Sequence, residues 1–200
     1  VLITWAGLLT ALTLAALARR NARFRRMGTT DPLTGVYNRT GGDWMVRHYL
    51  EEHENGQALV LAVDIDNFKI INDVYGHEAG DEALCQFTRD MKETFGRSAV
   101  ITRNGGDEFI IFCGYGWSRK VAEAIDRFTE NPHLITYKGK EIRFSASLGL
   151  ARYPEHDKDY RSLCIKADYA LYGANLNGKS RWKEFDPELN LKDTRPQRGF

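Results

Sequence analysis

Two adjacent carboxylates directly follow a glycine pair in the stretch Gly105-Gly106-Asp107-Glu108-Phe109. The stretch lies between two apolar, β-rich runs, residues 99–102 and 109–112. A Gly-Gly pair between such runs predicts a tight hairpin, because the favoured hairpin turns need positive φ angles. Side chains alternate along a strand, so we expect Asp107 and Glu108 to point to opposite faces. One acid could face a metal ion while the other reaches a substrate hydroxyl; a solvated hairpin tip is the alternative.

A second acidic group ends the continuous apolar run over residues 58–65, where Asp64 and Asp66 form an Asp-x-Asp pattern. A buried strand that ends in this way places carboxylates at the edge of a sheet where α/β proteins bind ligands. If Asp64 and Asp107 end neighbouring strands, they form one oxygen-rich site suited to Mg²⁺ or Mn²⁺ held with substrate phosphates. No histidine or cysteine adjoins these acids, which argues against zinc. Helix capping would explain one of the acids but not the set.

The residues after this pattern add an anion-binding feature. Backbone amides of Asn67 to Lys69, at the start of an expected helix, would face an anion, and Lys69 adds a positive charge. A pair of metal ions between carboxylates can activate an attacking hydroxyl and neutralise a leaving pyrophosphate. The two motifs together therefore favour phosphoryl-transfer chemistry.

The elements that must position these residues alternate between helix-like and strand-like stretches. Such alternation predicts an α/β sandwich with one central sheet. We expect helices over residues 39–54, 67–75, 79–95, 117–129 and 159–176, a strand over 58–65, hairpins over 99–113 and 133–150, and a short strand over 180–185.

Composition limits the class of protein. The chain has 200 residues, 42% of them hydrophobic and 12% aromatic, enough for one domain with a short appendage. Five of the 28 basic residues lie in residues 19–26, and the remainder of the chain is slightly acidic, which excludes a general nucleic-acid binder. The three cysteines, Cys85, Cys113 and Cys164, lie in apolar contexts without Cys-x-x-Cys spacing, so we expect reduced core residues.

The first eighteen residues carry no charge and precede the arginine cluster. As a helix they would be about 27 Å long, close to the thickness of a bilayer core. The arginines that follow predict the rest of the chain on the cytoplasmic face of a bacterial inner membrane. A signal peptide and a buried helix are the alternatives. We therefore expect a membrane helix with a basic linker over residues 1–26, a catalytic domain over 27–186 and a mobile polar tail over 187–200.

Residues from about Thr30 to Phe185 resemble the GGDEF family of diguanylate cyclases. The resemblance implies an enzyme that joins two GTP molecules into cyclic di-GMP and releases two pyrophosphates. It also implies an α+β sandwich with a mostly antiparallel sheet, similar to nucleotide cyclases and polymerase palms. The matching motifs are Asp31-Pro32-Leu33-Thr34-Gly35, Asn38-Arg39, Asp64 to Asp73, Tyr75-Gly76-His77, Gly80-Asp81, Gly105 to Phe109, Ser147-Leu148-Gly149, Ala167-Asp168 and Ala170-Leu171-Tyr172.

The family's roles transfer to matching positions of this chain. Asp64, Asp107 and the carbonyl of Ile65 match the ligands of two divalent ions, Mg²⁺ or Mn²⁺, in each active site. Glu108 matches the acid that helps to deprotonate the attacking 3′-hydroxyl. The positions that match substrate-binding residues are Asn67, Phe68 and Lys69 for the β- and γ-phosphates, Asn72 and Asp81 for guanine, and Lys179 for the triphosphate.

The chain departs from the family pattern at two positions where relatives carry a phosphate-contacting cation. Asn175 stands where the family has lysine, and Lys179 stands where it has arginine, which loses the bidentate fork. The allosteric product site of many relatives is also missing, because residues 96–99 lack its Arg-x-x-Asp pattern, and Arg97 is one position out of register.

The resemblance leaves two classes of function. Because one domain has one GTP-sized site, we expect an enzyme that works as a homodimer, with GTP as substrate and no nucleic-acid partner. A catalytically silent GGDEF domain that binds nucleotide or a protein partner is the alternative. A mixed GMP–AMP product is disfavoured because Asp81 is retained.

Overall fold

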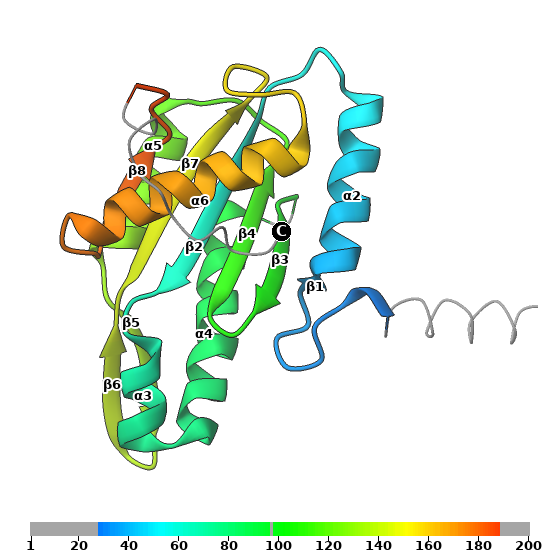
Figure 1. Cartoon of the computed structure of the whole chain (residues 1–200). Coiled ribbons are helices and arrows are strands. Elements are labelled where there is room, and N and C mark those ends of the chain that lie inside the picture. Colours follow the sequence, from blue (N-terminus) through cyan, green and yellow to red (C-terminus); the bar gives the residue numbers. More distant parts are fainter. Residues whose placement is uncertain (1–27, 97, 189–200) are drawn as a thin grey trace, which may run out of the picture.

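The computed structural model describes residues 28–96 and 98–188. A mixed sheet of six strands forms the centre of this part, and most of its neighbouring strands are antiparallel (Figure 1). The outer pairs β1–β3 and β7–β8 are parallel. In spatial order the strands are β1 (Tyr37–Asn38), β3 (Val100–Gly105), β4 (Glu108–Cys113), β2 (Ala58–Ile65), β7 (Ala146–Tyr153) and β8 (Trp182–Glu184).

The central strand β2 is buried on both faces and separates two hydrophobic layers. Its odd-numbered side chains, from Leu59 to Ile65, pack with α4 (His77–Phe95) and α5 (Arg119–Glu130). Its even-numbered side chains, from Ala58 to Ala62, pack with α2 (Arg39–Glu52) and α6 (Tyr160–Leu176). Figure 1 shows α6 crossing the near face of the sheet and α4 behind it. The period-two alternation of a strand thus assigns each side chain to one layer.

Three smaller elements extend beyond the ends of β2 and β7. The helix α3 (Phe68–Tyr75) follows β2 after two residues and packs on α4. The strands β5 (His133–Tyr137) and β6 (Lys140–Phe144) form a separate hairpin on the same side of the molecule, near α3 (Figure 1). These elements surround the strand ends at which the sequence places its carboxylates.

Most predicted elements are confirmed, and one is wrong in part. The predicted strand over 58–65 and the hairpin around Gly105-Gly106 are observed. The hairpin expected over 133–150 ends at Phe144, and residues 146–153 form a separate strand, β7, paired along its whole length with β2. The sequence of β7 is apolar enough for a strand of the β5–β6 hairpin and for a strand of the central sheet. Only pairing with β2 in the central sheet buries β7 on both faces.

The predicted location at a bacterial inner membrane is corrected. Across residues 28–96 and 98–188, none of the helices combines the length and the apolar character that crossing a bilayer requires. The predicted membrane helix over residues 1–18 and its basic linker lie outside the residues that the structure describes.

Candidate active site

Three polar side chains form a row across neighbouring strands at one end of the sheet. In the antiparallel pairings, Asp64 of β2 lies opposite Glu108 of β4 on one side and opposite Ser147 of β7 on the other. Directly opposed residues have Cβ atoms about 4.5–5.5 Å apart and share one face of the sheet. Because Asp64 continues the even-numbered series of β2, this face is the one covered by α2 and α6.

Asp107 lies in the turn before β4, and Gly105 is paired with Glu108 across that turn. Both glycines use their conformational freedom: Gly105 has φ 149° and Gly106 has φ 54°. The register therefore gives Glu108, and not Asp107, the position directly across from Asp64. Asp107 is the residue before Glu108 and occupies the hairpin tip.

Arg103 stabilises the turn at Gly105-Gly106. The sequence analysis did not identify this arginine. Its guanidinium donates to the carbonyl of Gly106 at 2.7 and 2.9 Å and forms an ion pair with Asp31 at 3.0 Å. Burial disfavours ionisation of Asp31, but hydrogen bonds from Thr34 and Arg103 outweigh it and lower the pKa of the carboxyl. The Asp31-Pro32-Leu33-Thr34 motif thus positions Arg103, and Arg103 in turn stabilises the turn at Gly105-Gly106.

Asp66 lies two residues beyond Asp64 and accepts hydrogen bonds from Ser147 of the row and from residues outside it. It is 8% exposed, and its carboxylate accepts hydrogen bonds from the hydroxyls of Ser145 and Ser147 at 2.7 and 2.8 Å. It also accepts from the backbone N–H of Ser180 at 2.9 Å. Neither Asp64 nor Asp66 caps α3, because the N-cap residue is Asn67 and its side chain makes no capping bond.

The predicted phosphate loop begins α3 and meets the loop after α6. Asn67 has a left-handed backbone, with φ 57°, and Phe68 is the first residue of the helix. The ammonium of Lys179 donates to Oδ1 of Asn67 at 2.8 Å. Two predicted phosphate-binding positions that are far apart in sequence are therefore neighbours, while the exposed Lys69 lies on the first turn of α3.

The predicted guanine-binding residues come from the facing helices α3 and α4. Gly80 lets the two helices approach, since a Cβ atom built on it would lie 2.0 Å from Oδ1 of Asn72. Asp81 is the next residue along α4 and is exposed to solvent. The structure thus brings Asn72 beside the Gly80-Asp81 pair, as a shared base-binding site requires.

The donor atoms in the acid row suit a hard cation. Among the described residues, no three His, Cys, Asp or Glu side chains gather into a metal-binding group. Asp64 at the end of β2 and Asp107, directly before Glu108 of the adjacent strand, supply carboxylate oxygens. Mg²⁺ is commonly bound by one or two carboxylates, with waters and substrate phosphates completing its shell. The residues therefore fit Mg²⁺ or Mn²⁺ bound together with a nucleotide.

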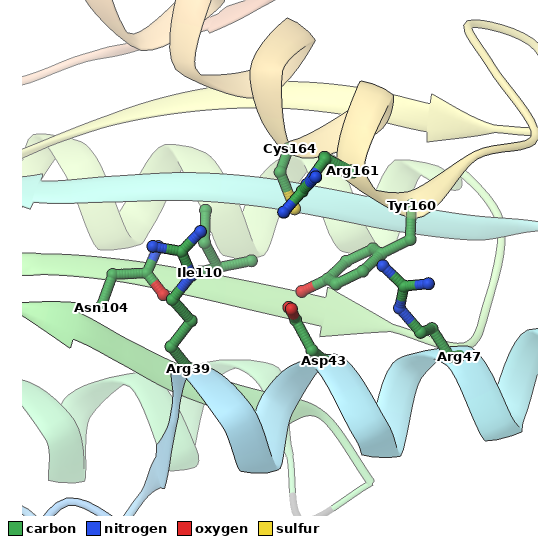
Figure 2. A pocket seen from close by; sticks show the side chains of 8 residues that line it. All are labelled: Arg39, Asp43, Arg47, Asn104, Ile110, Tyr160, Arg161 and Cys164. Carbon is green, nitrogen blue, oxygen red and sulfur yellow. The ribbon is translucent and has the colours of Figure 1, made fainter. Parts of the chain in front are cut away.

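A basic hollow lies further along the same face of the sheet, between α2 and α6 (Figure 2). It holds about 20 Å³, too little for a nucleotide. Arg39, Arg47 and Arg161 surround the carboxylate of Asp43 there, as Figure 2 shows. Burial raises the pKa of the Cys164 thiol in its wall to about 12. The hollow is separate from the Asn67–Lys179 loop and the Asn72–Asp81 pair.

Two further predictions concern positions that depart from the family pattern. Asn175 is half-buried near the end of α6, and its Oδ1 is buried without a hydrogen-bond partner among the described residues. Gly96 and Ala99 line a groove between the amino-terminal segment and the end of α4. Among the described residues that line this groove, the charged ones are Lys92 and Glu93.

The fold and the site define a palm-like α+β domain, with acids at the strand ends and the predicted phosphate-binding loops around them. A comparison with known families adds the particular family. The family model described as "Diguanylate cyclase, GGDEF domain" matches residues 28–181. The chain therefore belongs to the GGDEF family.

Similar proteins agree with this assignment and show how varied the family is. The chain is 35% identical over 172 residues to the probable diguanylate cyclase DgcC of Escherichia coli K12, covering 84% of this chain and 46% of the relative. It is 33% identical over 176 residues to the cyclic di-GMP phosphodiesterase PdeR of the same organism, covering 87% of this chain and 26% of that relative. The chain thus spans less than half of either relative.

The fold matches solved structures of GGDEF domains. One is the coiled coil and GGDEF domain of DgcB from Caulobacter crescentus, solved in complex with c-di-GMP. The TM-score is 0.76 at 22% sequence identity, and the match covers 88% of this chain and 95% of that one. The mixed sheet with its flanking helices is therefore the GGDEF fold.

Proposed function

We propose that this chain is an active diguanylate cyclase that condenses two GTP molecules into cyclic di-GMP and two pyrophosphates. The observation that carries the proposal is the register of Asp64 opposite Glu108, with the hairpin tip at Asp107 beside them. A domain that only binds nucleotide has no chemical need for a proton acceptor such as Glu108 beside the acids that would hold the metal ions.

Each residue of the site then has a defined task. Asp64, Asp107 and the carbonyl of Ile65 hold two Mg²⁺ or Mn²⁺ ions, which supply charge neutralisation and a more acidic attacking hydroxyl. The carboxylate of Glu108 takes the proton of the 3′-hydroxyl. The 3′-oxygen forms a bond to the α-phosphorus of the other GTP as the bond to pyrophosphate breaks.

The remaining residues bind and orient the substrate. The backbone at Asn67 and Phe68, with the ammonium groups of Lys69 and Lys179, binds the β- and γ-phosphates. The hydrogen bond from Lys179 to Asn67 supports this pairing. Asn72 and Asp81 read guanine, whose N1–H and exocyclic amine donate to a carboxylate, whereas adenine N1 only accepts.

Two copies of the chain are needed for one product. One base-reading pair per chain binds one GTP, so two sites must face each other across a two-fold axis. Each site then presents its 3′-hydroxyl to the α-phosphate bound by the other. Specific activity should therefore rise with protein concentration in the range where the dimer forms.

The competing function is a silent domain that binds nucleotide without turning it over. Asn175 favours this alternative, because an amide replaces a phosphate-binding cation. The test incubates the full chain with GTP and Mg²⁺ and resolves nucleotides by chromatography, beside Glu108→Gln and the exposed control Glu123→Gln. Cyclic di-GMP from the wild type and the control, but not from Glu108→Gln, supports the cyclase. Tight binding of a non-hydrolysable GTP analogue without product would identify the silent domain.

A further inference from the structure

Asp66 has no task in the proposed chemistry, yet it is a buried carboxylate with three hydrogen-bond donors around it. The donors are the hydroxyls of Ser145 and Ser147 and the backbone N–H of Ser180, at 2.7–2.9 Å. Its own N–H donates to the carbonyl of Ser145 at 2.9 Å. Buried carboxylates are retained only where such donors compensate the lost hydration. Asp66 therefore joins the end of β2, the start of β7 and the loop after α6.

These contacts close a ring that contains both phosphate-binding segments. Asp66 precedes Asn67 in the chain, and Lys179 precedes Ser180. The ammonium of Lys179 bonds to Asn67, and the N–H of Ser180 bonds to Asp66. Two neighbouring pairs of residues are thus linked by two hydrogen bonds, one part-buried and one exposed. We call Asp66, Asn67, Lys179 and Ser180 the clamp.

Three of the four clamp residues have a left-handed backbone, which asparagine adopts readily but lysine and serine rarely adopt. Asn67, Lys179 and Ser180 have φ angles of 57°, 62° and 48°. Among the described residues, the only other non-glycine residue with positive φ is Lys138, in the turn between β5 and β6. Such conformations persist where the surroundings fix them, and they gather at functional sites. Without the Asp66 carboxylate, the loop after α6 loses its part-buried attachment.

We propose that Asp66 is a positioning residue that holds Asn67 and Lys179 together for the triphosphate of the nucleotide. The inference rests on the proposed function, because it assumes that the clamp contacts GTP phosphates. The clamp also forms one wall of an open groove of about 470 Å³, to which Asp66, Asn67, Ser145 and Ser180 contribute. The base-reading pair on α3 and α4 does not belong to the clamp, so loss of Asp66 should affect phosphates and not guanine.

The hydrogen-bond chemistry separates two substitutions. Asp66→Ala removes every acceptor and leaves the Ser180 N–H without its partner. Asp66→Asn can accept from Ser180 and Ser145 through its oxygen and donate to the Ser147 hydroxyl through its amide. A hydroxyl can act as donor or acceptor, so the asparagine variant should keep the clamp.

The experiment compares two ligands on the full chain by calorimetry in the presence of Mg²⁺: a non-hydrolysable GTP analogue and guanosine. Asp66→Ala should weaken the analogue about tenfold or more and change guanosine less than about twofold, since only phosphate contacts are lost. Asp66→Asn should stay within about threefold of wild type for both. The control is Asp157→Ala, which removes a carboxylate with several hydrogen bonds beyond the opposite end of β7 and should change neither affinity.

Several outcomes would overturn the inference. Unchanged analogue affinity in Asp66→Ala, or equal losses for analogue and guanosine, would show that Asp66 only supports the fold. If Asp66→Ala does not fold, Ser145→Ala replaces it, with an expected loss of about threefold for the analogue alone; no loss refutes the clamp. If the wild type binds neither ligand, the proposed function is wrong. If the wild type binds both ligands and Asp66→Ala keeps its affinity for the analogue, only the inference about Asp66 is wrong.

Discussion

Gly80→Ala tests whether the approach of α3 to α4 builds the guanine-binding site. Gly80 is buried inside α4, and a Cβ atom there would lie 2.0 Å from Oδ1 and 3.0 Å from Cγ of Asn72, and 3.2 Å from Cζ of Phe68. These three atoms belong to side chains and not to backbone. The helices can therefore keep their places while the amide of Asn72 is displaced.

We expect Gly80→Ala to change the free energy of unfolding little and to weaken the binding of guanine nucleotides. Alanine in a helix interior is favoured over glycine by about 1 kcal/mol, which offsets the cost of moving two side-chain ends. The Asn72 amide must move by more than an ångström to reach ordinary contact distance, and a hydrogen bond does not survive such a shift. Loss of a buried hydrogen bond to the base costs about 1–3 kcal/mol, or roughly five- to 150-fold in affinity for guanine nucleotides.

Thermal unfolding and calorimetric titration with the non-hydrolysable GTP analogue check this prediction. The matched control is Gly173→Ala in α6, where a new Cβ would meet only the flexible end of Lys183, at 3.2 Å. Both variants should unfold within a few degrees of wild type, and only Gly80→Ala should lose affinity. Wild-type affinity in a folded Gly80→Ala protein would refute the role of Asn72; a large fall in its unfolding temperature would refute the side-chain argument.

Three further outcomes are expected. Asp64→Asn and Asp107→Asn should each abolish product formation without lowering the unfolding temperature, and more than about a tenth of wild-type activity in either would contradict their role. Added cyclic di-GMP should leave the initial rate unchanged, because residues 96–99 lack the arginine–aspartate pair; non-competitive inhibition would show another product site. The pKa of Asp31 is lower in the folded state than its value near 3.8 in the unfolded chain. The ionised carboxylate therefore stabilises the folded protein at pH values above 3.8, and this stabilisation is lost as the pH falls through the folded-state pKa. Denaturant unfolding should therefore show a deficit in Asp31→Asn at pH 7 that shrinks below about pH 4, and a constant deficit would contradict the pKa shift.

Local sequence patterns predicted the elements that carry the acids. The apolar run 58–65 can be buried on both faces only as a central strand, and the glycine pair at 105–106 has the freedom that its observed φ angles require. Asp64 belongs to the end of this run, and Asp107 and Glu108 directly follow the glycine pair, so the sequence itself places these acids at strand ends. Asp64 and Glu108 lie opposite each other in the antiparallel pairing of β2 with β4, and a slip of one residue would turn the buried side chains of β4 to the wrong face.

Long-range contacts could not be predicted in the same way. The pairing of β7 with β2 joins residues more than eighty positions apart, and a local pattern does not choose between that partner and β6. The two serines that bind Asp66 are Ser145 and Ser147, which the motif match included only in part. A serine alternation opposite an Asp-x-Asp strand end is a signal that could have suggested the contact.

The acid row and the predicted phosphate loop are attached to the fold by different contacts. This difference suggests how a member of the family can lose activity and keep its structure. The acid row depends on strand register inside the sheet, and Arg103 and Asp31 hold its hairpin through a partly buried ion pair. The predicted phosphate loop is attached through the proposed clamp, where one contact is the exposed Lys179–Asn67 bond. Exposed contacts of this kind contribute little to stability. A substitution at position 179, in the loop after α6, is therefore expected to change phosphate binding at little cost to the fold, whereas changes at the acid row must preserve a buried register.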